Sequence, residues 1–320
     1  MKRLSKVFVL LALLVSTIGL LVTGCGAQPA PVRLGMLPII DNLPFWVAQE
    51  KGYFKDEGVE VELVAFPSAV ERDSAVAGGK IDGALGDLLA VALLNQGGTA
   101  VRAVAVGQGV KPEEGRFAIL AAPNSGLTSV AQLKNVEIAI SPNSIIEYVT
   151  DRLLQKEGFK PEEIKKTSIP KIPLRLEALL NGTVKAATLP DPFAAMAESK
   201  GARLLLDDTR ENLSQTVIFF RQDTLDKNLA GAQKVMKAYA RAVSDLQKNP
   251  AGYNDLLVAK AGVPKELLTA GNHGMKIVFS APVLPGRGAV EDVVNWMLER
   301  KLLSQKPTFE QLVDKRVLGQ

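Results

Sequence analysis

Segments that favour strands and segments that favour helices alternate along most of the chain. Val32–Leu37, Val59–Phe66 and Ile81–Leu85 have patterns that favour strands, with apolar and acidic residues alternating at the start of Val59–Phe66, and each is followed by a helical pattern. Ser68 begins the second of these helices with a capping box, because its hydroxyl can accept from a free backbone N–H while Glu71 reaches back to another. This alternation predicts an α/β fold in which helices cover both faces of mostly parallel sheets.

A second series of such units begins at Phe117. Its predicted strands are Phe117–Ala122, Val136–Ile140, Lys185–Leu189, Arg203–Leu206 and Val217–Phe220, with helices between most of them. Gly79–Ala84 and Gly182–Ala187 share a pattern in which a helix stop leads into a strand that runs on to an acidic residue. We therefore expect two lobes with mixed, mostly parallel sheets. Residues 32–116 plus 221–320 would form lobe 1, residues 117–220 lobe 2, and two crossings the hinge.

The N-terminus has the pattern of an export signal. Basic residues within the first six positions precede the apolar run Val7–Val22, which is short for a bilayer span of about 20 residues. Val22–Cys25 resembles the lipobox of bacterial lipoproteins, and Cys25 is the only cysteine of the chain. We expect residues 1–25 to be a lipoprotein signal peptide ending at the lipidated Cys25, and residues 26–31 to be a tether. An uncleaved anchor helix is the alternative.

Composition argues against several classes of function. The formal charge is +4, but three of the cations lie in the leader and the remaining basic residues are scattered, so nucleic-acid binding has no support. His273 is the only histidine, and no nucleophile elbow, phosphate-binding loop or dinucleotide fingerprint is present. A single cysteine also leaves no thiolate cluster for a metal. We therefore expect a protein that is not an enzyme and that needs no cofactor or metal.

Several motifs together resemble one known family. Leu43–Phe54 and the following Glu57–Glu62 are similar to the opening of the nitrate/sulfonate/taurine-type periplasmic binding proteins. The wider superfamily of these proteins includes binders of thiamine-pyrimidine precursors. Gly79–Gly83, Gly126–Lys134 and Pro190–Phe193 are similar to later landmarks of the same family.

The resemblance extends from Leu34 to about Asp208 and has clear implications. It implies the two-lobe fold of type II periplasmic binding proteins and capture of a small polar solute by closure of the lobes. It also implies an extracytoplasmic, lipid-anchored monomer that delivers the solute to the permease and ATPase of an ATP-binding-cassette (ABC) importer. A sensor or signalling lipoprotein and a catalytic descendant of the same fold remain open as alternatives.

Candidate ligand-binding residues lie where the predicted strands end, because open α/β sheets bind ligands beyond the carboxyl ends of their strands. They are Asp41, Asn42, Phe45, Phe66, Ser68, Asp87, Ser141, Asn143, Ser144, Asp191 and Phe193. Asp41, Ser68 and Asp87 have an alternative role as helix caps.

The charge of these candidates indicates a class of ligand. Asp41, Asp87 and Asp191 are acids at predicted strand–helix turns, and we expect no lysine or arginine to stand at a strand's carboxyl end. Three carboxylates would oppose a bound anion. The sequence therefore favours an amine-bearing or donor-rich heterocyclic ligand, while a sulfonate or nitrate remains possible.

The lipobox generates the first testable prediction. Cys25→Ser removes the thiol that would be acylated, so the variant should remain an unprocessed precursor without lipid label. Metabolic labelling with a radioactive fatty acid, followed by gel electrophoresis, measures both effects. Normal labelling of the variant would exclude acylation at this position.

Overall fold

The computed structural model describes residues 30–211, 213, 215–269 and 273–319. Cys25 and the rest of the leader therefore lie outside the described residues. Residues 31–320 form one compact unit. Among the residues that the structure describes, no helix is long and apolar enough to cross a membrane.

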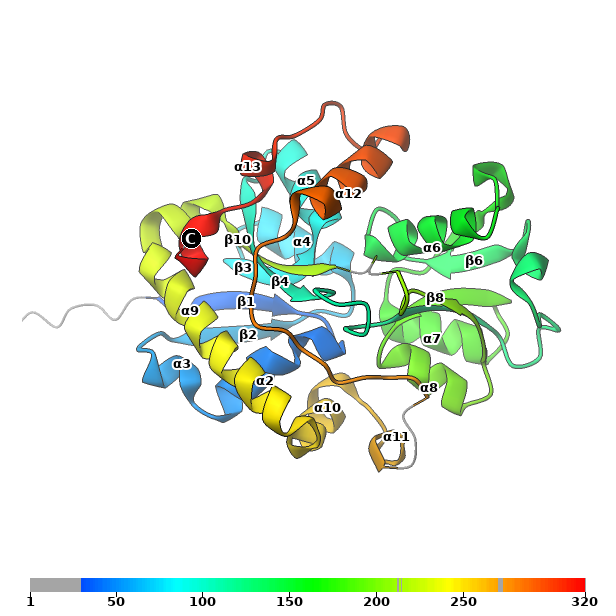
Figure 1. Ribbon diagram of the computed structural model, residues 1–320, viewed down its shortest axis with the longest axis horizontal. Coiled ribbons are helices and arrows are strands. Elements are labelled where there is room, and N and C mark those ends of the chain that lie inside the picture. Colours follow the sequence, from blue (N-terminus) through cyan, green and yellow to red (C-terminus); the bar gives the residue numbers. More distant parts are fainter. Residues whose placement is uncertain (1–29, 212, 214, 270–272, 320) are drawn as a thin grey trace, which may run out of the picture. The chain divides into compact units, whose positions relative to one another are not determined.

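The first sheet contains five strands in the order β2-β1-β3-β10-β4 (Figure 1). Its strands are β1 (Val32–Met36), β2 (Val61–Ala65), β3 (Gly83–Asp87), β4 (Val101–Gln108) and β10 (Thr216–Arg221). The helices between them are η1 (Ile40–Asn42), α2 (Leu43–Glu50), α3 (Tyr53–Asp56), α4 (Ala69–Ala77) and α5 (Leu88–Gln96). β1 pairs in parallel with β2 and β3, whereas β10 runs antiparallel to both β3 and β4.

The second sheet also contains five strands, in the order β7-β6-β8-β5-β9. They are β5 (Phe117–Ala121), β6 (Glu137–Ile140), β7 (Lys165–Ser168), β8 (Ala186–Pro190) and β9 (Arg203–Asp207). Its helices are η2 (Val130–Leu133), α6 (Ile145–Lys156), η3 (Pro161–Glu163), α7 (Ile172–Leu180) and α8 (Phe193–Ser199). β5 is the antiparallel strand here, and it pairs with β8 and β9.

The rest of the chain is mostly helical, as expected. It forms α9 (Gln222–Lys248), η4 (Pro250–Tyr253), α10 (Asn254–Ala261), α11 (Lys265–Thr269), α12 (Arg287–Glu299), α13 (Phe309–Leu312) and η5 (Lys315–Leu318). Figure 1 shows the long helix α9 beside α2 and α3, where the rings of Phe45 and Tyr239 lie 4.8 Å apart. α12 instead packs against α5.

The observed sheets confirm the predicted α/β class and add two strands that the pattern did not reveal. β7 has the sequence Lys-Lys-Thr-Ser and lies at a sheet edge, so it lacks the apolar run that marks a buried strand. β4 was not recognised although it is almost wholly buried. The chain passes from the first sheet to the second between β4 and β5, and returns between β9 and β10. The lobe boundaries at residues 117 and 220 stay a prediction. β10, which contains residue 220, pairs within the first sheet.

The close approach of β3 and β10 depends on a glycine. A Cβ atom at Gly83 would lie 2.5 Å from the Phe219 carbonyl oxygen and 2.8 Å from Phe220 Cδ1. Both are closer than a carbon atom tolerates, so the strands would have to separate.

Gly83→Ala should therefore lower the free energy of unfolding by about 1–3 kcal/mol, the usual effect of overpacking a core. Urea titration followed by circular dichroism measures this change. Gly288→Ala is the matched control, because a Cβ at Gly288 meets no atom within 4 Å and alanine favours the helix α12. Equal stability of Gly83→Ala and the wild type would contradict the close approach.

Candidate functional site

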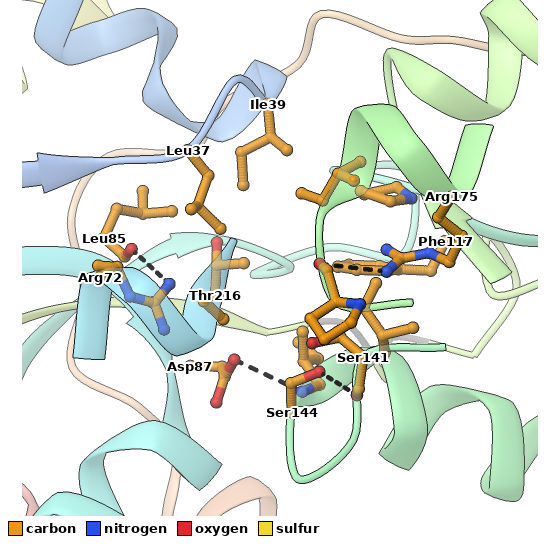
Figure 2. Close-up of a pocket in the computed structure, with 17 residues that line it drawn as sticks. Leu37, Ile39, Arg72, Leu85, Asp87, Phe117, Ser141, Ser144, Arg175 and Thr216 are labelled. Carbon is orange, nitrogen blue, oxygen red and sulfur yellow. Dashed lines mark hydrogen bonds between the residues drawn. The ribbon is translucent and has the colours of Figure 1, made fainter. Parts of the chain in front are cut away.

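A pocket of about 40 Å³ lies where the two sheets face each other (Figure 2). Leu37, Leu85, Asp87 and Thr216 line it from the first sheet and its loops, and Phe117, Ser141, Ser144 and Ile172 line it from the second. Most of its wall is apolar. By the usual measure of about 10–15 Å³ per water molecule, it has room for a compact group of only a few heavy atoms.

Arg72 brings a positive charge to one side of this pocket. It lies in α4, its side chain is 2% exposed, and its Nη1 donates to the Leu85 carbonyl oxygen at 3.0 Å. Its Nε donates to Asp73 at 2.8 Å, whereas its buried Nη2 has no hydrogen-bond partner within the described part of the chain. Burial alone would lower the pKa of Arg72, but the Asp73 carboxylate raises it overall. The guanidinium therefore stays charged.

Arg175 brings a second positive charge to the opposite side (Figure 2). It lies in α7 and is fully buried, with Nε donating to the Thr188 carbonyl oxygen at 2.9 Å and Nη1 to that of Ile169 at 2.7 Å. Its Nη2 is buried without a partner in the described structure. Burial lowers the pKa of Arg175 to about 9, so this side chain is also protonated at neutral pH.

The sequence analysis considered only cations at the carboxyl ends of strands, whereas Arg72 and Arg175 reach the pocket from the helices α4 and α7. Sequence reasoning missed Arg72 and Arg175 because charged residues on helices usually face solvent. A signal was nevertheless present in α7, where Ile172, Leu176 and Leu179 share the buried side of the helix with Arg175. A charge on the apolar side of an amphipathic helix is the pattern that could have revealed it.

Asp87 is one of the candidate residues that line the pocket. As the cap of α5 it accepts from the Ala90 N–H at 2.8 Å, and its other oxygen lies 3.5 Å from the Ile145 N–H at the start of α6. One carboxylate thus lies between the N-termini of helices from both sheets, where the partial positive charge of each helix stabilises it. Burial raises the pKa of Asp87.

Ser141 and Ser144 are the other candidates that line the pocket. The Ser144 hydroxyl donates to the Ser141 carbonyl oxygen at 2.7 Å. The Ser141 hydroxyl is buried and has no hydrogen-bond partner in the described structure, so it can donate to a ligand. Whether these residues and Asp87 contact a ligand stays a prediction.

Asp191 lies outside the pocket lining and is paired with a cation. Its two oxygens accept from Arg116 Nε and Nη2, each at 3.0 Å, and both side chains are almost fully buried. Arg116 also donates to Glu198 at 2.9 Å. The charge of Asp191 is therefore neutralised within the fold.

Asp41 lies behind the pocket wall rather than in it. It is buried and accepts from the hydroxyl of Thr216, a lining residue, at 2.8 Å. Burial raises the pKa of Asp41 to about 6, although the hydrogen bond from Thr216 opposes this shift. The neighbouring Asn42 side chain donates to the Leu37 carbonyl oxygen at 2.8 Å.

The remaining candidates have roles in packing or capping, and none lines the pocket. Ser68 caps α4 as predicted, accepting from the Glu71 N–H at 3.3 Å. Phe45 packs on Tyr239, Phe193 is in the core, and Phe66 is partly buried against it. Asn143 has a left-handed backbone, and its N–H donates to Glu147 at 2.8 Å.

Comparison with known proteins identifies the family. The NMT1/THI5 like family matches residues 40–252, which is most of the chain. The chain belongs to this family. The resemblance to nitrate- and sulfonate-type solute-binding proteins predicted from the sequence is thereby confirmed at the level of the family.

Curated relatives match parts of the chain. The bicarbonate-binding protein CmpA of Synechococcus elongatus is 32% identical over 130 residues, which cover 38% of this chain and 27% of CmpA. A putative aliphatic sulfonates-binding protein of Escherichia coli is 26% identical over 214 residues, covering 66% of this chain and 65% of that protein. The matched region therefore spans less than two thirds of either relative.

Solved structures confirm the type II periplasmic-binding-protein fold. The alkanesulfonate-binding protein SsuA of Xanthomonas axonopodis superimposes with a TM-score of 0.77 at 20% identity, covering 90% of this chain and 99% of that one. The nitrate-binding protein NrtA of Synechocystis gives 0.76 at 15% identity, with 90% and 87% covered. The desulfurization enzyme DSZB has the same fold, with a TM-score of 0.65, 14% identity, and 90% and 97% covered.

The Arg116–Asp191 pair generates a stability prediction. Asp191→Asn removes the negative charge that pairs with the buried Arg116 guanidinium, so the free energy of unfolding should fall by about 3 kcal/mol. Glu198→Gln is the control, because it keeps the buried pair and should lower stability by about 1 kcal/mol or less. Thermal and urea unfolding of both variants measure the difference. Unchanged stability of Asp191→Asn would show that the pair contributes little to the fold.

Proposed function

We propose that this protein is the solute-binding component of an ABC importer and that it captures a small oxyanion between its two sheets. Membership of the NMT1/THI5-like family supports the transport role, as does the likeness to binding proteins for sulfonates and nitrate. The single observation that carries the choice of ligand is the pair of buried guanidinium groups of Arg72 and Arg175 at the pocket.

The unpaired donors of the pocket support an anion. Arg72 Nη2, Arg175 Nη2 and the Ser141 hydroxyl are buried without partners in the described structure. Leaving such donors unsatisfied costs about 1–3 kcal/mol each, and more for charged groups, so a ligand that accepts from all three would be stabilised strongly. A protonated amine has only donors to offer and would add a third positive charge.

The three acids that the sequence placed at strand ends, Asp41, Asp87 and Asp191, do not rule out an anionic ligand. Asp191 is neutralised by Arg116, and Asp87 is held by the N-termini of α5 and α6. Asp41 stands behind Thr216, outside the pocket lining. The amine preference inferred from the sequence therefore loses its basis, and the sulfonate or nitrate alternative becomes the better one.

The pocket fits binding better than catalysis. The described residues include no group of three or more histidine, cysteine or acidic side chains that could hold a metal. His273, the only histidine, does not line the pocket, and the likeness to DSZB concerns the fold alone. We further propose that the protein is extracytoplasmic and is anchored by lipid at Cys25, as the leader predicts.

The arginine pair generates a binding prediction. Arg72→Gln and Arg175→Gln should each weaken anion binding roughly ten- to hundredfold, since a hydrogen bond to a charged group contributes about 1.5–3 kcal/mol. Calorimetric titration with nitrate, bicarbonate and methanesulfonate, and with methylammonium as the cationic comparison, measures the affinities.

Arg287→Gln is the matched control, because Arg287 is 65% exposed in α12 and pairs with Glu310 away from the pocket. It should bind as the wild type does, and melting curves should show that all three variants are folded. Binding of methylammonium but of no anion would overturn the proposal.

A further inference from the structure

Thr216 connects the pocket to a buried acid. Its hydroxyl oxygen lies 2.8 Å from Asp41 Oδ2 and accepts from the Gln108 backbone N–H at 3.0 Å. All three residues are buried, and Thr216 alone of them lines the pocket. The hydrogen-bond state of Thr216 therefore depends on a group that a ligand in the pocket need not touch.

The direction of the Thr216 hydroxyl follows from its neighbours. A hydroxyl has one proton to donate and two lone pairs. While Asp41 is ionised it is an acceptor only, so Thr216 gives its proton to Asp41 and offers the pocket only a lone pair. A lone pair and a buried carboxylate behind it both oppose an anion.

Protonation of Asp41 reverses this arrangement. A neutral Asp41 can donate to the second lone pair of Thr216, which leaves the hydroxyl proton free to point into the pocket. Thr216 then becomes a donor beside Arg72 and Arg175, and the buried negative charge is removed.

We propose that Asp41 is a positioning residue that acts through Thr216, so that an oxyanion enters the pocket together with one proton bound by the Asp41 carboxyl group. This inference rests on the proposed function, because it concerns the same pocket and the same class of ligand. It adds that capture of the anion is linked to pH.

The surroundings of Asp41 support a titration near physiological pH. Burial raises its pKa to about 6, and the charge of Asp191 adds to the shift. Asp191 is itself paired with Arg116, which limits its effect. Tyr239 of α9 also faces Asp41 and stays neutral, because burial and the negative charge of Asp41 raise its pKa. Gln108 of β4 carries no charge.

The sign of the pH dependence follows. Below about pH 6 Asp41 is already protonated in the unliganded protein, so anion binding needs no further proton. Above that pH each binding event must take up one, and the dissociation constant should rise about tenfold per pH unit. A bound anion raises the pKa of Asp41 further, as reciprocal linkage requires.

Calorimetry of the full mature protein tests the proposal with nitrate and methanesulfonate, two anions that stay ionised from pH 5 to 8. Titrations at pH 7.5 in buffers of different ionisation enthalpy should show uptake of about one proton per anion, and titrations at pH 5 almost none. Asp41→Asn imitates the protonated acid, so proton uptake should vanish and the affinity should no longer vary with pH. Thr216→Val should bind more weakly at pH 5, with Thr216→Ser restoring the affinity.

Asp87 provides the decisive comparison, because it lines the pocket and burial also raises its pKa. Proton uptake that persists in Asp41→Asn but is lost in Asp87→Asn would overturn the inference and leave the proposed function intact. Anion binding with no proton uptake in the wild type would do the same. Failure of both anions to bind at any pH would overturn both. Asp82→Asn, an acid paired with Arg33 outside the pocket lining, should keep the wild-type profile.

Discussion

Each sheet of this protein depends on an antiparallel strand that the chain supplies after leaving the other sheet. β5 follows β4 into the second sheet, and β10 follows β9 back into the first. Since both run against their parallel neighbours, their first residues lie at the carboxyl ends of those neighbours. Thr216 is opposite Asp87, and Phe117 is opposite Pro190. All four residues line the pocket, so the strand exchange that joins the sheets also builds the site.

The electrostatics of the site depend on two buried guanidinium groups, whose hydrogen-bond donors are satisfied only in part by backbone carbonyl oxygens. Among the described residues, Arg175 has three carbonyl oxygens as acceptors and no carboxylate, so its positive charge is not cancelled locally. Among the described residues, Arg72 donates to one acid, Asp73, and the charge of Asp87 also acts on it. Burying a guanidinium is unfavourable unless its donors are satisfied, and in the part of the chain that the structure describes each of these two groups retains one nitrogen without an acceptor. A binding protein can retain such an unfavourable feature because its ligand relieves it.

The sequence predicted the fold better than the site. Strand–helix alternation and the helix cap at Ser68 depend on neighbouring residues, and the structure bears both out, although the return bond from Glu71 that would complete the capping box is not among the contacts of the described residues. The polar turns at Asp87, Ser141 and Ser144 lie at the pocket because strand ends meet there. The pairing of Asp191 with Arg116 could not be predicted, because it joins residues 75 positions apart in the chain. Arg175 was marked only by its place on the apolar side of α7, and the burial of Arg72 depends on how α4 packs. Local patterns reveal which residues end strands, but not which charges are buried together.

The exchange of strands also affects the order in which the protein can fold. β3 and β4 are complete by residue 108, but β10, the strand that lies between them, begins only at residue 216. A chain that emerges N-terminus first thus carries an unfinished first sheet until the second has been synthesised. Contacts across such long separations form slowly, because a large loop must close first. That delay keeps the first sheet open along β3 and β4 until the chain returns from the second sheet.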